Sequence, residues 1–280
     1  MKKVFALIIS VLLPVFAWGQ AQINTKKVKL SDFTQKITKV VLTGNDFMDN
    51  ALKDEITLRW RISPYEFCTL NEFNELKTNE DYYFLLTTNG QFKKDDSPTI
   101  QFLTLVKGGA KAADGIDSML EVVSLPTASV QFPTGREMTF LPAFLNIIQT
   151  FTLDAMEKDA NAYGGLRNYS VNIRRSDDSR IVFSIDDLAF SVENLEGDSF
   201  GKDITVADEA EVNQLLKDSA AETIVSYVVA PFDPQPGAYC YKMLIDARNH
   251  TLYYYKRHKI SETKGAGFLE EDLKRIYSVR

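Results

Sequence analysis

The chain has 280 residues, of which 45% are hydrophobic and 25% charged, and its formal net charge is −6. This composition is typical of a folded globular protein and excludes collagen-like or disordered chains. An acidic chain without a long basic run is a poor candidate for nucleic-acid binding, so no nucleic-acid partner is expected.

The amino terminus has the pattern of a secretory signal peptide. Lys2 and Lys3 precede the uncharged apolar residues 4–16, and small residues lead to Gly19. This apolar run is shorter than the roughly 20 residues that a membrane-spanning helix needs. Residues 1–19 are therefore predicted to be a signal peptide cleaved near Gly19. The mature chain, with a formal charge of −8 once both lysines are removed, is expected in the periplasm or outside the cell, without a transmembrane span.

Only two cysteines, Cys68 and Cys240, occur in the sequence, and both lie in apolar runs. Two cysteines cannot form the disulfide framework of a small secreted domain. We expect two buried, reduced thiols in separate halves of the chain. A disulfide between them remains an alternative, because an exported protein meets an oxidising environment.

Residues 27–125 are predicted to form a first α/β domain with the element order βαβαββ. A strand at residues 40–43 is followed by a helix with apolar positions at a four-residue spacing. A second strand at residues 65–68 precedes a helix that begins with a capping box, Thr69 and Glu72. Two further strands are expected at residues 81–88 and 99–106, and a helix is possible near residues 116–123. The apolar positions of the first helix are Met48, Leu52, Ile56 and Trp60.

Residues 169–280 are predicted to be a second domain related to the first by internal duplication. Residues 182–188 match 41–47, and residues 223–230 match 81–88. In this interpretation, the strand near residues 251–256 corresponds to residues 99–106, and residues 231–246 are an insertion. The fold class expected is α/β (α+β), with two related βαβαββ-type domains joined by a central apolar helix.

The connecting segment, residues 126–168, contains that central helix. Residues 139–153 include no charged side chain, and apolar residues recur at helical spacing, with Pro142 placed in the first turn. We expect the helix to pack between the two halves. The alternative is a helix that binds a partner or a membrane surface. The apolar stripe consists of Phe144, Ile147, Ile148, Phe151 and Ala155.

No catalytic, metal or cofactor motif is present in the sequence, so no catalytic residue, metal ligand or cofactor is predicted. His250 and His258 are too few for most zinc sites, and His250 is expected to be exposed in a hairpin turn. A pair of carboxylates across a cleft could serve glycoside hydrolysis. The carboxylates considered for this are Asp46, Asp49, Glu66, Glu72, Asp186 and Asp187.

A basic cluster near the carboxyl terminus is the candidate binding surface. Strand alternation places Tyr254 and Lys256 on one face, and Tyr253, Tyr255 and Arg257 on the other. Such a cluster could hold an anionic envelope polymer or an acidic partner; the alternative is a solvated strand end that discourages aggregation. The candidate residues are Lys242, which would join through hairpin pairing, with Tyr254, Lys256, Arg257, His258 and Lys259.

Residues 63–67, 252–259, 267–269 and 272–274 resemble uncharacterised exported proteins of Bacteroidota. The βαβαββ halves are also similar to the small α/β modules of envelope assembly proteins such as the TolB N-terminal domain. Neither resemblance implies a catalytic residue, because architecture does not fix function.

These observations favour an exported, non-enzymatic cell-envelope protein that binds an envelope component or a protein partner. The alternative is a hydrolase of envelope polysaccharide or peptidoglycan that uses carboxylates in a groove between the domains. Ligand identity and oligomeric state stay open at this point.

Overall fold

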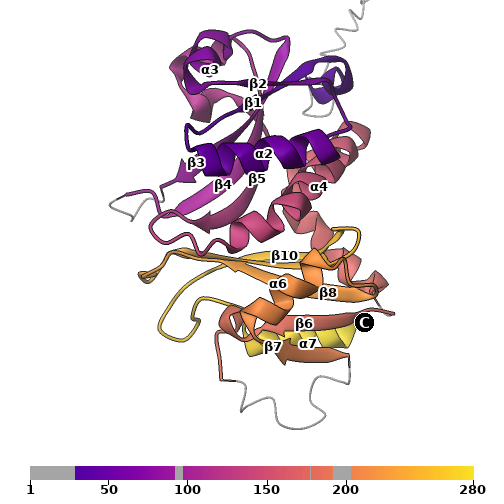
Figure 1. Cartoon of the computed structure of the whole chain (residues 1–280). Coiled ribbons are helices and arrows are strands. Elements are labelled where there is room, and N and C mark those ends of the chain that lie inside the picture. Colours follow the sequence, from indigo (N-terminus) through magenta and orange to yellow (C-terminus); the bar gives the residue numbers. More distant parts are fainter. Residues whose placement is uncertain (1–28, 92–96, 177, 192–202) are drawn as a thin grey trace, which may run out of the picture.

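The computed structural model describes residues 29–91, 97–176, 178–191 and 203–280. It contains two five-stranded mixed sheets, one from each half of the chain, with a long helix between them (Figure 1). The predicted signal peptide, residues 1–19, lies outside the described residues. Within the described part, no helix is both long and apolar enough to cross a membrane.

The first sheet has the strand order β2-β1-β3-β4-β5, and the second has the order β7-β6-β8-β9-β10. The strands of the first sheet are β1 (Ile37–Val41), β2 (Tyr65–Cys68), β3 (Tyr82–Gly90), β4 (Ile100–Lys107) and β5 (Leu120–Ser129). Those of the second are β6 (Arg180–Ser184), β7 (Ile204–Ala207), β8 (Thr223–Val229), β9 (Tyr239–Asp246) and β10 (Leu252–Lys259).

Both sheets have the same topology. In each, the first strand of the half pairs in parallel with the second and third, and the last three strands form an antiparallel meander. The fold class, mixed α/β with two similar sheets, is therefore confirmed. Descent of the halves from one duplicated unit stays a proposal.

The equivalent strands of the two halves differ from those predicted from the sequence. β9 pairs with β8 as β4 pairs with β3, so β9 is the counterpart of β4 and not an insertion. β10 is then the counterpart of β5. β5 replaces the helix considered near residues 116–123, of which only the short 3-10 turn η3 (Ile116–Ser118) forms. Each half thus has five strands, not four.

Helix α2 (Asp46–Arg59) begins at Asn45, whose side-chain oxygen accepts hydrogen bonds from the Phe47 and Met48 amides. Leu52, Ile56 and the following Trp60 are buried as predicted, whereas Met48 is only half-buried. The second half has a different element at this position. Its first strand leads into the 3-10 turn η5 (Ile185–Asp187) rather than into a helix.

The shorter helices lie on the crossovers and in the carboxyl-terminal half. The predicted capping box of Thr69 and Glu72 begins α3, and Asp208 caps α6 by accepting from the Glu211 amide. These remaining helices are α3 (Leu70–Leu76), α5 (Asp159–Gly164), η4 (Gly165–Arg175), α6 (Glu209–Lys217) and α7 (Glu270–Val279), together with the short turns η1 (Phe33–Gln35) and η2 (Ala110–Asp114).

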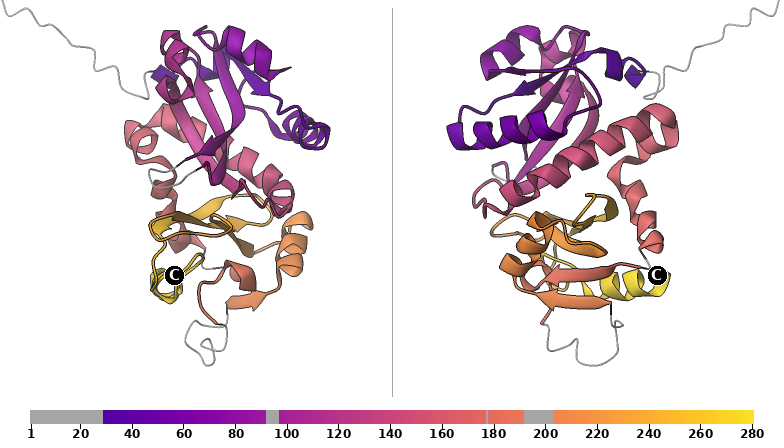
Figure 2. Two further views of the ribbon diagram at one scale, coloured as in Figure 1. Left: turned by 90° about the vertical axis from the view of Figure 1, so that its left-hand side faces the viewer. Right: turned by 45° about the vertical axis from the view of Figure 1, so that its right-hand side comes forward.

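The central helix α4 (Arg136–Glu157) crosses between the two sheets, as expected (Figures 1 and 2). Its entire predicted stripe is buried in one hydrophobic core that includes residues of both sheets, for example Val40 of β1 and Val225 of β8. The helix begins earlier than predicted, so Pro142 lies in the second turn and not the first. The burial on α4 accounts for the stripe without a membrane or partner surface.

Both cysteines are buried and free, one in each sheet, as expected for reduced thiols. The predicted limits of the second domain, residues 169–280, enclose the whole second sheet, whereas the first limit at residue 125 cuts β5, which extends to Ser129. The two sheets share one hydrophobic core through α4, so the limits separate the sheets but not the core. That each half folds independently stays a prediction.

Candidate functional site

The predicted basic cluster is divided by the two faces of β10. Lys242 pairs directly with Lys256 across the β9–β10 hairpin, which confirms the predicted hairpin pairing. Lys242 is nevertheless fully buried, and its ammonium donates to Asp272 of α7. Lys256 Nζ donates to the other oxygen of Asp272 at 2.6 Å, and the Tyr254 hydroxyl donates to the same oxygen at 3.1 Å. Lys242 and Tyr254 are thus core residues and not surface contacts.

The ionisation of Asp272 is set by its two lysine partners. Burial alone would raise its pKa, but hydrogen bonds and attraction from Lys242 and Lys256 hold the pKa at about 2. The same burial lowers the pKa of Lys242, against the opposing effect of Asp272. One carboxylate therefore binds both ammonium groups on this face and balances one of their two charges.

The alternation predicted along β10 is broken by a bulge between Leu252 and Tyr254. Because of the bulge, Tyr253 packs with Tyr254 against the α7 side of the sheet instead of joining Tyr255. Tyr255 lies on the α4 side in the central core. The predicted grouping of Tyr253 with Tyr255 is wrong for this reason.

Arg257 and Lys259 remain exposed at the end of β10. The two cations lie over the ring of Tyr239, at 4.8 and 5.7 Å from its centroid. His258 is half-buried and its Nε2 lies 2.9 Å from the Gly265 carbonyl oxygen. The exposed part of the predicted surface therefore consists of two cationic side chains, Arg257 and Lys259, at the end of β10.

The predicted exposure of His250 is wrong. The side chain is only 7% exposed, and its Nδ1 lies 2.7 Å from Asn146 Nδ2 of α4. Its backbone has φ 61°, a left-handed conformation that turns the hairpin toward the central helix. Burial lowers the pKa of His250, so the neutral ring that accepts from Asn146 is the favoured form at neutral pH.

A groove lies between the two sheets, at the location that the alternative, hydrolase interpretation of the sequence assumed. It has a volume of about 230 Å³ and is lined by residues from β5, the start of α4, η5, the start of α6, and β8 with the loop that follows it. We call it the inter-sheet groove. It is lined by Ala128, Ser129, Phe132, Thr134, Arg136, Glu137, Asp186, Asp187, Glu209, Tyr227, Val228, Val229, Ala230, Phe232 and Ala266.

Arg136 holds the floor of the groove together. It is buried, and its Nη1 and Nη2 donate to the two oxygens of Asp187 at 2.7 and 3.0 Å. Nη2 also donates to the Ser226 carbonyl, and Nε donates to Asn213 of α6. Burial opposes the charge on Arg136, but Asp187 raises its pKa above the usual value. The bidentate pair connects the first turn of α4 to the second sheet.

A second contact joins the sheets directly beside this pair. The Tyr227 hydroxyl of β8 donates to the Thr127 carbonyl oxygen of β5 at 2.6 Å. Arg136 also lies over the rings of Phe140 and Tyr227, at 5.2 and 4.9 Å from their centroids. These contacts hold the two walls of the groove together.

Two polar atoms on the groove wall are buried without a hydrogen-bond partner among the described residues. They are Ser129 Oγ and Glu137 Oε2. The Glu137 side chain as a whole is only 7% exposed. Buried acceptors without donors are unfavourable and occur often at functional sites. These two residues therefore make the groove a candidate binding site, in which the carboxylate accepts hydrogen bonds and the serine hydroxyl can accept or donate.

The rim of the groove carries an exposed aromatic pair. Phe132 and Phe232, one from each half of the chain, stack with ring centroids 3.9 Å apart and an interplanar angle of 29°. They are 55% and 61% exposed. Large apolar side chains exposed beside a polar groove are typical of binding sites.

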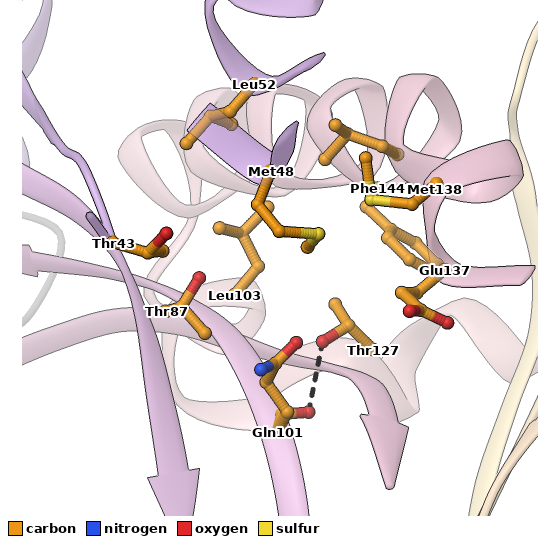
Figure 3. A pocket seen from close by; sticks show the side chains of 11 residues that line it. Thr43, Met48, Leu52, Thr87, Gln101, Leu103, Thr127, Glu137, Met138 and Phe144 are labelled. Carbon is orange, nitrogen blue, oxygen red and sulfur yellow. Dashed lines mark hydrogen bonds between the residues drawn. The ribbon is translucent and has the colours of Figure 1, made fainter. Parts of the chain in front are cut away.

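Glu137 also lines a second, smaller pocket inside the first half, between α2, α4 and the first sheet (Figure 3). The volume there is about 40 Å³, enough for a water molecule but not for a larger group. Figure 3 shows Glu137 on the opposite side of this pocket from Thr43, with Thr127 of β5 nearby. Glu137 therefore separates the apolar interior from the inter-sheet groove.

The chemistry available in the groove comes from carboxylates. Of those considered from the sequence, Asp186 and Asp187 line it, together with Glu137 and Glu209. Asp49 and Glu72 instead accept hydrogen bonds near the starts of α2 and α3. Among the described residues, no group of three or more His, Cys, Asp or Glu side chains is placed to hold a metal ion.

Sequence reasoning found none of the groove residues except the two aspartates. The available signal was Arg136 and Glu137 at the start of an otherwise apolar helix, where charged side chains have to find a partner or solvent. Comparison of the chain with protein-family models, with curated proteins and with solved structures gives no match.

Proposed function

We propose that this chain is an exported, non-enzymatic binding protein of the cell envelope, which holds an envelope component or a protein partner at the inter-sheet groove. The observation that carries the proposal is the pair of buried, unpartnered atoms, Ser129 Oγ and Glu137 Oε2, beside the exposed Phe132–Phe232 stack. The signal-peptide pattern of residues 1–19 supports export. The resemblance to exported proteins of Bacteroidota supports the envelope as the place of action.

The test is capture of an envelope component with and without the aromatic rim. The purified protein is immobilised and incubated with the envelope fraction of the source bacterium. We expect Phe132→Ala with Phe232→Ala to lose the captured component, because both rings are exposed and their removal leaves the core intact. Phe47→Ala, which removes a 71% exposed ring on α2, is the matched control and is expected to retain it. Equal capture by all variants would refute the groove as the binding site.

Hydrolysis of an envelope polysaccharide or peptidoglycan is a second candidate, since Glu137, Asp186 and Glu209 line the same groove. Two carboxyl groups on opposite sides of a glycosidic bond are the usual requirement for that reaction. Incubation with purified peptidoglycan distinguishes the candidates. Release of soluble fragments that stops in Glu137→Gln would favour the hydrolase, and binding without fragments would favour the binding protein.

A further inference from the structure

The inter-sheet groove is strongly acidic for its size. Four carboxylates line it, those of Glu137, Asp186, Asp187 and Glu209, but only one basic side chain, Arg136, does so. Both terminal nitrogens of Arg136 are bound to Asp187. The groove therefore retains three carboxylates for which none of the ion pairs among the described residues provides a partner.

The unpartnered oxygen of Glu137 favours a ligand group that donates a hydrogen bond. It is an acceptor, it is shielded from water, and it lies at a carboxylate whose charge is not balanced by Arg136. A cationic donor would satisfy the charge and the hydrogen bond together, and such charge-assisted bonds are about twice as strong as neutral ones. The Ser129 hydroxyl, which can accept or donate, is a second polar group without a partner on the same wall.

The size and rim of the groove favour a small organic cation over a polymer segment. Its volume of about 230 Å³ is below the usual range for a whole drug-sized ligand, roughly 300–1,000 Å³, and suits one side-chain-sized group. The exposed faces of Phe132 and Phe232 can cover the apolar stem of such a group and attract its charge.

We propose that the inter-sheet groove is a subsite for an organic cation, an alkylguanidinium or alkylammonium group, with Glu137 as the residue that binds its charge. This inference rests on the proposed function, because it names the ligand class of the same groove. Asp186 and Glu209 add attraction, and Arg136 acts through Asp187 by fixing the start of α4 on which Glu137 lies. The cation can be a free small molecule or a basic side chain of a partner.

The experiment uses two probes of nearly equal shape, n-butylguanidinium and the neutral n-butylurea, titrated calorimetrically into the protein. We expect the cation to bind at least tenfold more tightly than the urea, and its affinity to fall as salt is raised. Glu137→Gln keeps the size of the side chain and is expected to reduce the affinity for the cation about tenfold or more, with little effect on the urea.

Two variants complete the design. Glu209→Gln, at a half-buried carboxylate on the groove wall, is expected to give a smaller loss, and it serves if Glu137→Gln does not fold. Glu75→Gln, at an exposed carboxylate of α3 outside the groove, is expected to change nothing. The peptide Gly-Gly-Arg-Gly-Gly tests the source: tighter binding than n-butylguanidinium indicates a partner's side chain, and weaker binding indicates a free small cation.

Equal affinity for the two butyl probes would overturn the proposal of a cation subsite. Unchanged cation binding in both Glu137→Gln and Glu209→Gln would also overturn it. The proposed function would survive that result if capture from the envelope fraction still required Phe132 and Phe232. If that capture is also independent of the aromatic rim, the proposed function fails as well. The two failures are therefore distinguishable.

Discussion

Asp272 of α7 accepts hydrogen bonds from side chains of both β9 and β10 on the outer face of the second sheet. It is fully buried and accepts from Lys242, which is also fully buried, as well as from Lys256 and Tyr254. A buried charge whose partner is removed remains desolvated and unbalanced, which typically costs about 3–5 kcal/mol of stability. Replacing both members of such a pair by apolar residues is often neutral.

We therefore expect Asp272→Ala to lower the free energy of unfolding by about 3–5 kcal/mol, because it leaves the Lys242 ammonium without its partner. The double variant Lys242→Met with Asp272→Leu should lose much less. Denaturant titrations of both variants and the parent measure the difference. A loss in the double variant as large as that in Asp272→Ala would show that the unpaired Lys242 charge is not the cause.

His250 gives a pH dependence whose sign follows from burial. Desolvation lowers its pKa below the usual 6.5, so the unfolded chain takes up the proton first as the pH falls. The stabilising contribution is complete above about pH 6.5 and is lost as the pH falls toward the folded-state pKa. We expect the free energy of unfolding to decrease from pH 7.5 to pH 5.

His250→Asn should flatten this slope, since asparagine tolerates the positive φ at this position and does not titrate. His258, whose pKa is also lowered by burial, contributes in the same direction, so His258→Asn provides the matched comparison. A parent slope that His250→Asn leaves unchanged would assign the pH dependence to other groups.

At this scale, local side-chain roles could be predicted and distant ones could not. The capping box of Thr69 and Glu72 spans three residues, so its geometry follows from the helix start. Lys242 and His250 find their partners 30 and 104 residues away. The spacing of apolar residues does not indicate which helix covers a given strand. From the sequence alone, Lys242 and His250 are therefore expected at the surface.

Among the elements, β10 retains a testable part of the original prediction. Arg257 and Lys259 are exposed at its end, whereas Lys242 and Lys256 are bound to Asp272. Replacing Arg257 and Lys259 by Ser should reduce binding to purified anionic envelope polymer, more so at low salt, and should hardly change the melting temperature.

The matched control is Lys274→Ser with Arg275→Ser, which removes the same charge from exposed positions on α7. Equal losses in both double variants would mean that only net charge matters. No loss in either would identify the end of β10 as a solvated strand end that protects a sheet edge.

The sequence predicted elements with a single buried face and missed β5, which has no such face. α2 and α4 show their helical spacing because one side of each packs against a sheet. β5 is buried over much of its length and also contains Pro126, so it lacks the alternation by which strands are recognised. Because β5 is missing from the sequence prediction, β4 is matched with β10 instead of β9. β9 is then interpreted as an insertion.

For the whole molecule, the continuous core predicts one unfolding transition. Phe144 of α4 lies in a cluster with side chains of both sheets, and the Arg136–Asp187 pair adds a polar link. Trp60 fluorescence reports on the first half, and hydrogen exchange of the β9 amides reports on the second. We expect the two probes to give the same midpoint in denaturant.

Phe144→Ala should lower the free energy of unfolding by about 3–5 kcal/mol, because it leaves a cavity between the two sheets. Both probes should report the same decrease in the denaturant midpoint. If two separate transitions are observed, one for each sheet, the two halves of the chain are independent folding units. The common strand order of the two sheets is compatible with either result.

The two free cysteines offer a chemical record of such opening. Cys68 lies in β2 at an edge of the first sheet, and Cys240 lies in β9 in the interior of the second. Burial raises the pKa of each thiol to about 11, so neither forms an appreciable thiolate while its sheet is closed. The rate of alkylation by iodoacetamide, measured at each cysteine by peptide mass spectrometry, therefore reports the opening of each sheet separately. No substitution is needed for this experiment. An oxidant that reaches these sulfurs will likewise modify only the molecules that have opened.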